Sequence, residues 1–145
     1  LSLRRQRQMC IRDRNEIEIN KNGINHPLYK NKDKKFNSPA FNFDEVVKIP
    51  DKGICLASNK INKVQGLYFE VNKTKIWGLQ YHPEITYEKM INLIEFRKER
   101  LIESRKVFKD DTEVQKHIAF IKKEISVSDK EKRMLELKNW LNELN

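Results

Sequence analysis

Residues 77–84 read Trp-Gly-Leu-Gln-Tyr-His-Pro-Glu, and a β-rich run ends abruptly there at a histidine. In an open α/β sheet, residues just beyond the carboxyl end of a strand face the crevice where ligands bind, so we expect His82 there. Pro83 restricts the backbone, which helps Glu84 to orient one imidazole nitrogen and leave the other for a nucleophile. A histidine backed by a carboxylate is the base-and-orienter pair of nucleophilic catalysis. On spacing alone, a loop histidine with a local hydrogen bond is the alternative interpretation.

The sequence before this stretch predicts short strands. Polar and apolar residues alternate over residues 16–19, and the segment 26–39, which contains two prolines, is expected to be a loop. The further expected strands cover residues 41–47 and 54–57, and a hairpin with strands at 64–71 and 75–80 is joined by 72–74.

The sequence after this stretch predicts helices. Apolar residues recur at helical spacing over residues 87–103, with Thr86 as the expected N-cap. Two capping-box patterns predict two further helix starts. They are Thr112 with Gln115 and Ser128 with Glu131. The last helix carries an apolar stripe, which we expect to be packing surface. Its members are Met134, Leu137, Leu141 and Leu144, with Trp140 beside them.

The stretch at residues 78–84 resembles the G-x-Q-[FY]-H-P-E signature of class I glutamine amidotransferases, which is long and specific. Other runs of that family, D-x-V, L-P and L-A-S, have counterparts here. They are residues 43–46, 49–50 and 55–58, followed by Val-Gln-Gly at 64–66. The resemblance is closest to the stand-alone, GMP-synthase-like amidotransferases, and the Lys-Asn-Trp-Leu sequence at 138–141 also fits that group.

The resemblance covers about residues 15–102 and implies an α/β fold, an open sheet with flanking helices. Residues 15–103 would be the C-terminal part of such a domain and residues 104–145 a helical tail. The first strands of the parent fold have no counterpart here. We therefore expect the natural gene to continue upstream of Asn15.

The resemblance also implies a reaction. A cysteine thiolate attacks the side-chain amide of glutamine, ammonia leaves, and water hydrolyses the thioester to give glutamate. His82 would take the thiol proton and deliver one to ammonia, while Glu84 would fix the tautomer and stabilise the imidazolium. Ammonia would pass to an acceptor on a synthase partner or another domain, and no cofactor is implied.

The nucleophile of that reaction is missing from the sequence. The family places its cysteine in a G-x-C-x-G elbow upstream of the histidine, and no such motif occurs here. Cys55 lies in an apolar strand pattern without flanking glycines, so we expect a buried small hydrophobe. Cys10 lacks the elbow as well. The 145 residues alone are therefore expected to have no glutamine-hydrolysing activity.

Three residues at the start of the D-x-V segment are candidate neighbours of the substrate. Asn42 stands where many members of the family have histidine, and the backbone around that position contacts glutamine in relatives. The resemblance thus implies substrate-binding roles for Asn42, Phe43 and Asp44, with strand packing as an equal alternative. His26 and His117 are assigned no chemistry.

Composition narrows the class of protein. The net charge of +9 includes +4 from residues 1–14, and elsewhere lysines alternate with acids as on a solvated helix face, so no nucleic-acid partner is expected. With two cysteines, three dispersed histidines and no long apolar run, we expect a cytoplasmic protein with no metal site and no membrane segment.

Residues 1–14 differ in composition from the rest and resemble translated adapter read-through, so we set them apart as a non-native leader. An ordinary basic tail is the alternative. Two other functions remain open for the whole chain. One is a non-catalytic binding or structural module derived from the amidotransferase fold, and the other is a γ-glutamyl hydrolase.

Overall fold

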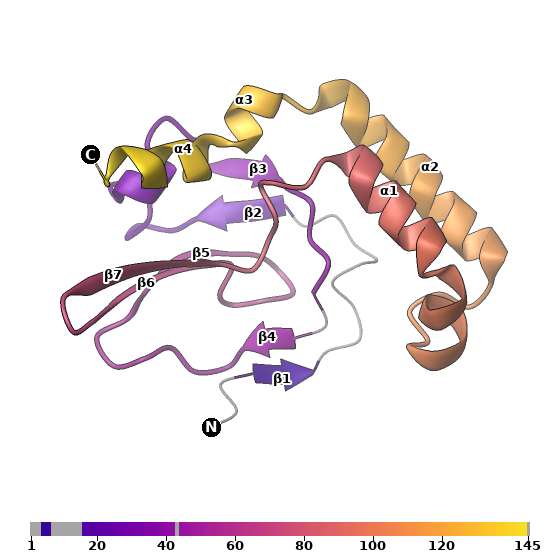
Figure 1. The fold of residues 1–145 in the computed structure, drawn as a ribbon, viewed down its shortest axis with the longest axis horizontal. Coiled ribbons are helices and arrows are strands. Elements are labelled where there is room, and N and C mark those ends of the chain that lie inside the picture. Colours follow the sequence, from indigo (N-terminus) through magenta and orange to yellow (C-terminus); the bar gives the residue numbers. More distant parts are fainter. Residues whose placement is uncertain (1–3, 7–15, 43, 145) are drawn as a thin grey trace.

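The computed structural model describes residues 4–6, 16–42 and 44–144 and has the mixed α/β architecture that the sequence predicts (Figure 1). An antiparallel five-stranded sheet has the strand order β3-β2-β5-β6-β7. Its strands are β2 (Glu16–Ile19), β3 (Lys35–Asn37), β5 (Ile54–Ser58), β6 (Gly66–Val71) and β7 (Thr74–Leu79). A separate antiparallel ribbon joins β1 (Arg4–Gln6) to β4 (Asp44–Val46).

The β6–β7 hairpin leads directly to the 77–84 stretch. Its two-residue turn, Asn72 and Lys73, has φ values of 48° and 67°. Two consecutive residues with positive φ are typical of a type I′ turn, whose twist matches that of the flanking strands. The register pairs Leu67 with Gly78. Strand β7 is an edge strand of the sheet, and the chain reaches His82 just beyond its carboxyl end.

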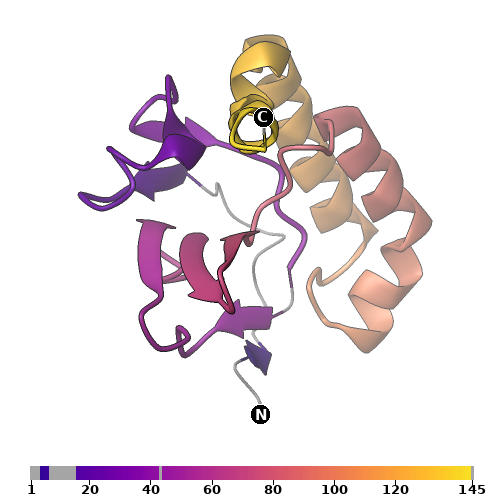
Figure 2. The ribbon, with the colours of Figure 1, turned by 60° about the vertical axis from the view of Figure 1, so that its left-hand side comes forward.

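Helices follow the sheet. Helix α1 (Tyr87–Phe96) packs beside α2 (Asp111–Val127), and a π-helical turn, η2 (Arg100–Ser104), lies between them in the chain. The short helices α3 (Lys130–Arg133) and α4 (Leu135–Asn142) return from α2 along the β3 side of the sheet (Figures 1 and 2). There α4 contacts η1 (Pro27–Tyr29), a 3-10 turn.

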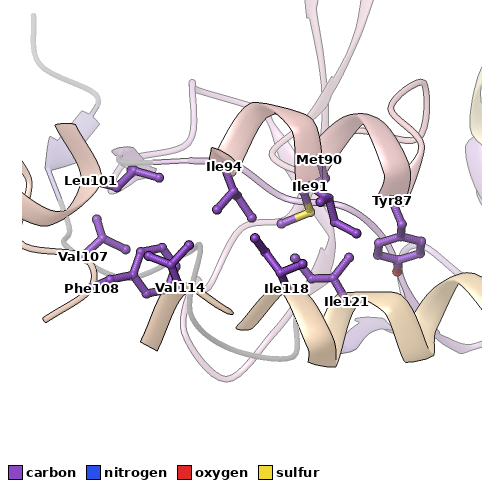
Figure 3. Close-up of a cluster of buried hydrophobic side chains, with 10 residues drawn as sticks. All are labelled: Tyr87, Met90, Ile91, Ile94, Leu101, Val107, Phe108, Val114, Ile118 and Ile121. Atoms are coloured by element: carbon purple, nitrogen blue, oxygen red, sulfur yellow. The ribbon is translucent and has the colours of Figure 1, made fainter. Parts of the chain in front are cut away.

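Two apolar clusters stabilise these layers. One lies within the helical layer, where side chains of α1, η2 and α2 face one another (Figure 3). The other is formed by residues of the sheet and of the segments that pack against it, and it includes Ile17, Ile19, Leu56 and Tyr81. The helical layer therefore has a core of its own, and α3 and α4 connect it to the sheet.

The strand predictions are largely confirmed. Strands β2 and β5, the hairpin and the Thr86 N-cap lie where the sequence indicates. The loop prediction for residues 26–39 is wrong in part, because the segment contains η1 and the edge strand β3. The strand expected over 41–47 is only β4, Asp44–Val46.

Both capping-box predictions name the wrong N-cap residue, because a nearby aspartate caps each helix instead. The N-cap of α2 is Asp110, whose Oδ1 accepts from the Glu113 amide at 2.9 Å. The N-cap of α3 is Asp129, whereas Ser128 ends α2 as its C-cap. Aspartate accepts amide hydrogens with a full negative charge near the positive helix end, which favours it over the adjacent serine or threonine.

The prediction for the last helix is wrong in part. Met134 and Leu137 of the expected apolar stripe are half-buried, whereas Leu141, Leu144 and the adjacent Trp140 are exposed. The buried face of the tail carries polar residues, Arg133, Glu136 and Asn139. They are buried because their hydrogen-bond partners are backbone carbonyls and a buried tyrosine rather than apolar side chains.

Of the first fourteen residues, which we set apart as a leader, Arg4–Gln6 forms β1. The rest of that segment lies outside the described residues. Within the described part of the chain, every helix is too short or too polar to cross a bilayer.

A substitution at Gly66, which pairs with Leu79 at the carboxyl end of β7, tests the packing around that strand end. A Cβ atom at this position would lie 2.2 Å from the Tyr29 hydroxyl oxygen, so we expect Gly66→Ala to lower the free energy of unfolding by about 1–3 kcal/mol through overpacking. Gly78→Ala is the matched control in the paired strand. Its Cβ would meet Leu67 at 3.4 Å, an ordinary contact, and we expect a change within about 0.5 kcal/mol. Urea unfolding measures both, and equal effects would contradict the packing described here.

Candidate active site

His82 and Glu84 form a hydrogen-bonded pair on a tight turn. The Ile85 amide donates to the His82 carbonyl at 3.2 Å, which closes a turn with Pro83 at its second position. Proline presets the φ angle that this position needs. The turn brings His82 Nδ1 within 2.7 Å of Glu84 Oε1. The two side chains, spaced two residues apart in the sequence, therefore meet as a pair.

The contact with Glu84 determines which ring nitrogen of a neutral His82 carries the hydrogen. A carboxylate can only accept, so the hydrogen of a neutral His82 lies on Nδ1 and the Nε2 lone pair is left to accept a proton. The side chains of His82 and Glu84 are 36% and 52% exposed. An ion pair or hydrogen bond so open to water contributes only about 0–1 kcal/mol, so the pair does not hold its own geometry.

Backbone contacts place the pair against the neighbouring segment. The His82 amide donates to the Pro39 carbonyl at 2.8 Å. Nearby, the Asn42 side-chain amide lies 3.5 Å from Gln80 Oε1, a long contact. Asn42 is thus brought beside the motif.

The other two predicted substrate neighbours are placed differently. Asp44 begins β4, in the separate ribbon rather than in the five-stranded sheet. Phe43 lies outside the described residues. Of the three predicted substrate neighbours, only Asn42 has a described contact with the 77–84 stretch.

Tyr81 anchors the strand end just before His82. Its side chain is 2% exposed, and its hydroxyl is hydrogen-bonded to that of Tyr29 at 3.2 Å. It also donates to Glu136 Oε1 at 2.7 Å. Burial in the first place, and then the nearby Tyr29 and Glu136, raise the pKa of Tyr81 well above its ordinary value. The phenol therefore stays protonated and acts as a fixed donor.

The tail contributes residues that the sequence analysis missed. Arg133 Nη1 donates to the Pro83 carbonyl at 2.5 Å and to the Ile85 carbonyl at 2.8 Å, on either side of Glu84. The only signal in the sequence is the spacing of Arg133, Glu136 and Asn139, three residues apart on one helix face. Charged residues in such a pattern are usually solvated, so the spacing by itself indicates no buried role.

Cys55 lies in β5 as predicted, but it is half-buried rather than fully buried. Its Sγ lies 3.4 Å from the carbonyl oxygens of Ala57 and Lys63. Burial raises the pKa of the Cys55 thiol, which is the opposite of what a nucleophilic cysteine needs. Cys10 lies outside the described residues.

The two remaining histidines have local structural contacts. His26 caps η1, with Nδ1 accepting from the Leu28 amide at 3.2 Å, and its ring packs against Tyr68 and Trp77. His117 packs between Phe108 and Phe120 in the helical layer. Among the described residues, no group of three or more histidine, cysteine or acidic side chains is arranged to hold a metal ion.

Comparisons with known proteins find two relatives whose names describe hydrolysis of glutamine or of a γ-glutamyl amide. No protein-family model matches the chain. It is 38% identical over 68 residues to a glutamine-hydrolyzing GMP synthase subunit of Methanocaldococcus jannaschii, which is 46% of this chain and 35% of that protein. It is 30% identical over 70 residues to a γ-glutamyl-L-1-hydroxyisopropylamide hydrolase of Pseudomonas sp., which is 48% of this chain and 23% of that one.

The matched regions thus span about a quarter to a third of these curated relatives. The similarity agrees with the resemblance carried by residues 78–84. It supports an amidotransferase-type relationship in its broad form.

The thiol of Cys55 can be tested directly in a Cys10→Ser background. Because only the thiolate is alkylated and burial raises the Cys55 pKa, we expect iodoacetamide to react more slowly at pH about 7 than with the urea-unfolded chain. The rate should keep rising with pH beyond the ordinary thiol pKa. Faster reaction in the folded chain than in the unfolded one would reveal an activated thiolate and contradict this description.

Proposed function

We propose that this chain supplies the histidine and carboxylate of a class I glutamine amidotransferase, with a cysteine nucleophile provided by sequence outside these residues. One observation carries the proposal: His82 Nδ1 lies 2.7 Å from Glu84 Oε1 on a turn that directly follows a strand. The similarity to a glutamine-hydrolyzing synthase subunit supports the same reaction.

In the proposed mechanism, Nε2 of His82 accepts the proton of the cysteine thiol as the sulfur attacks the side-chain carbonyl of glutamine. The imidazolium then returns that proton to the leaving nitrogen, and ammonia departs. Glu84 stabilises the imidazolium through Nδ1. Water, deprotonated by the same Nε2, hydrolyses the γ-glutamyl thioester to glutamate and regenerates the thiol. Ammonia passes to an acceptor on a synthase partner or a further domain.

Asn42 is the described residue best placed to help bind glutamine, because its amide lies beside Gln80 and one segment of chain joins it to Pro39, the acceptor of the His82 amide. An amide side chain can both donate to and accept from the amide or carboxylate of the substrate.

Hydrolysis of another γ-glutamyl amide is the second candidate, and the similarity to the Pseudomonas hydrolase favours it. The two candidates use the same thioester chemistry and differ in the leaving amine. Ammonia released from glutamine, compared with amine released from a γ-glutamyl alkylamide, distinguishes them.

We expect no ammonia release from glutamine by the 145 residues alone. A histidine with its carboxylate lacks the covalent route when the only described thiol, Cys55, is half-buried with a raised pKa. A coupled glutamate dehydrogenase assay measures the glutamate formed. Turnover that persists after Cys55→Ser would show that another nucleophile operates and would contradict the proposal.

In the complete enzyme encoded by the natural gene, we expect His82→Ala to lower kcat for glutamine hydrolysis by about 10²–10⁴-fold, because the proton shuttle is lost. Glu84→Gln should lose less, since the imidazole remains but is less well oriented. Ammonia supplied externally should still support the acceptor reaction in both variants, which controls for folding. Near-normal glutamine hydrolysis by a folded His82→Ala enzyme would exclude His82 as the base.

A further inference from the structure

The buried polar face of the tail contacts both sides of the His82–Glu84 pair. Arg133, which is 8% exposed, donates through Nη1 to the carbonyl oxygens of Pro83 and Ile85. These two carbonyls flank Glu84. One guanidinium nitrogen therefore fixes the carbonyl groups of the two residues that precede and follow Glu84, whose carboxylate holds the imidazole.

Glu136 acts on the other side of the pair. Its carboxylate is fully buried, accepts the Tyr81 hydroxyl hydrogen at 2.7 Å and pairs with Lys32 Nζ at 2.8 Å. Tyr81 directly precedes His82 in the chain. The partners of Glu136 thus fix the point from which the histidine extends.

These contacts come from a segment remote in the sequence. The two Arg133 bonds and the bond between Glu136 and Tyr81 join residues 48 to 55 positions apart, and the bond between Glu136 and Lys32 joins residues 104 positions apart. All are made from one face of α3 and α4. Asn139, on the same face, donates instead to the carbonyls of Leu28 and Lys30 in the η1 region, at 2.9 Å each. Asn139 therefore attaches the tail to the domain without touching the site.

Physical considerations assign the tail contacts a positioning role. The His82–Glu84 pair is too exposed to water to fix its own geometry. Hydrogen bonds with a charged donor are about twice as strong as neutral ones, and those of Arg133 are shielded from water. Losing the guanidinium would leave two carbonyls without this partner and free the turn to rotate the Glu84 side chain away from Nδ1.

We propose that Arg133 and Glu136 are positioning residues for the His82–Glu84 pair, so that the helical tail is part of the active site. The catalytic meaning of this role rests on the proposed function. The structural effect on His82 does not, and it can be measured in the chain as it stands.

The test reads the His82 tautomer by two-bond ¹H–¹⁵N correlation spectra of the 145-residue chain in mildly alkaline buffer. The wild type should show His82 protonated on Nδ1. Arg133→Met keeps an apolar stem of similar length but removes the donors. We expect it to shift His82 toward the Nε2-protonated form that histidine favours in water.

Asn139→Ala is the matched control, because it loosens the same tail face at η1 and leaves the Arg133 bonds in place. We expect the His82 tautomer to stay as in the wild type while stability falls. Arg133→Lys should lie between wild type and Arg133→Met, since an ammonium reaches carbonyls with less fixed geometry than a guanidinium. Glu136→Gln should shift the tautomer in the same direction.

The outcomes separate the two proposals. An unchanged His82 tautomer in folded Arg133→Met overturns the positioning role, and so does an equal shift in Asn139→Ala. If Arg133→Met does not give a dispersed amide spectrum, the comparison of wild type with Arg133→Lys decides, and identical tautomers overturn the role. A wild-type His82 protonated on Nε2 would instead contradict the pair itself and with it the proposed function.

Discussion

The rest of the site depends on a buried polar contact, the donation of Arg133 to the carbonyls of Pro83 and Ile85. Beside it, Glu136 joins Tyr81 and Lys32, all three being nearly inaccessible to water. Burial lowers the pKa of Lys32, and Glu136 opposes that shift, so the ammonium is retained by its carboxylate partner. Removing one member of such a buried pair typically destabilises a protein by about 3–5 kcal/mol, because the other charge is left uncompensated. Specific polar groups therefore attach the most buried face of the tail to the domain.

In this arrangement the His82–Glu84 pair is exposed to water, whereas the tail residues that contact its turn are buried. In the proposed mechanism the pair has to reach substrate, and His82 and Glu84 are indeed partly open to water, where their contact stabilises little. Their geometry comes from Pro83 within the turn, from the Pro39 carbonyl that accepts the His82 amide, and from the tail. The helical layer has its own apolar core (Figure 3), and this core holds α2, the helix from which the chain continues into α3 and α4. Sheet, helical layer and tail thus meet at the turn.

Local patterns predicted much of this fold and little of the support for its site. Strand β2, the hairpin and the Thr86 cap follow from alternation, turn residues and capping chemistry within a few positions. The 77–84 stretch predicted the candidate pair, and the turn brings its two atoms together. By contrast, Arg133, Glu136 and Asn139 are buried because of partners 48 to 111 residues away, which no local pattern contains. The apolar stripe of the last helix is exposed at Leu141 and Leu144 for the same reason, since helix amphipathicity identifies the buried face only when burial is apolar.

In the proposed mechanism, the tail acts on catalysis through the orientation of Glu84. A double-mutant cycle with Arg133→Met and Glu84→Gln in the complete enzyme tests it most directly, with kcat/KM for glutamine as the measured quantity. If Arg133 works by holding the turn that carries Glu84, its loss should cost far less once the Glu84 charge is gone, and the double variant should resemble the worse single variant. Fully additive losses in transition-state free energy would show that the two residues act independently and would exclude this role of Arg133.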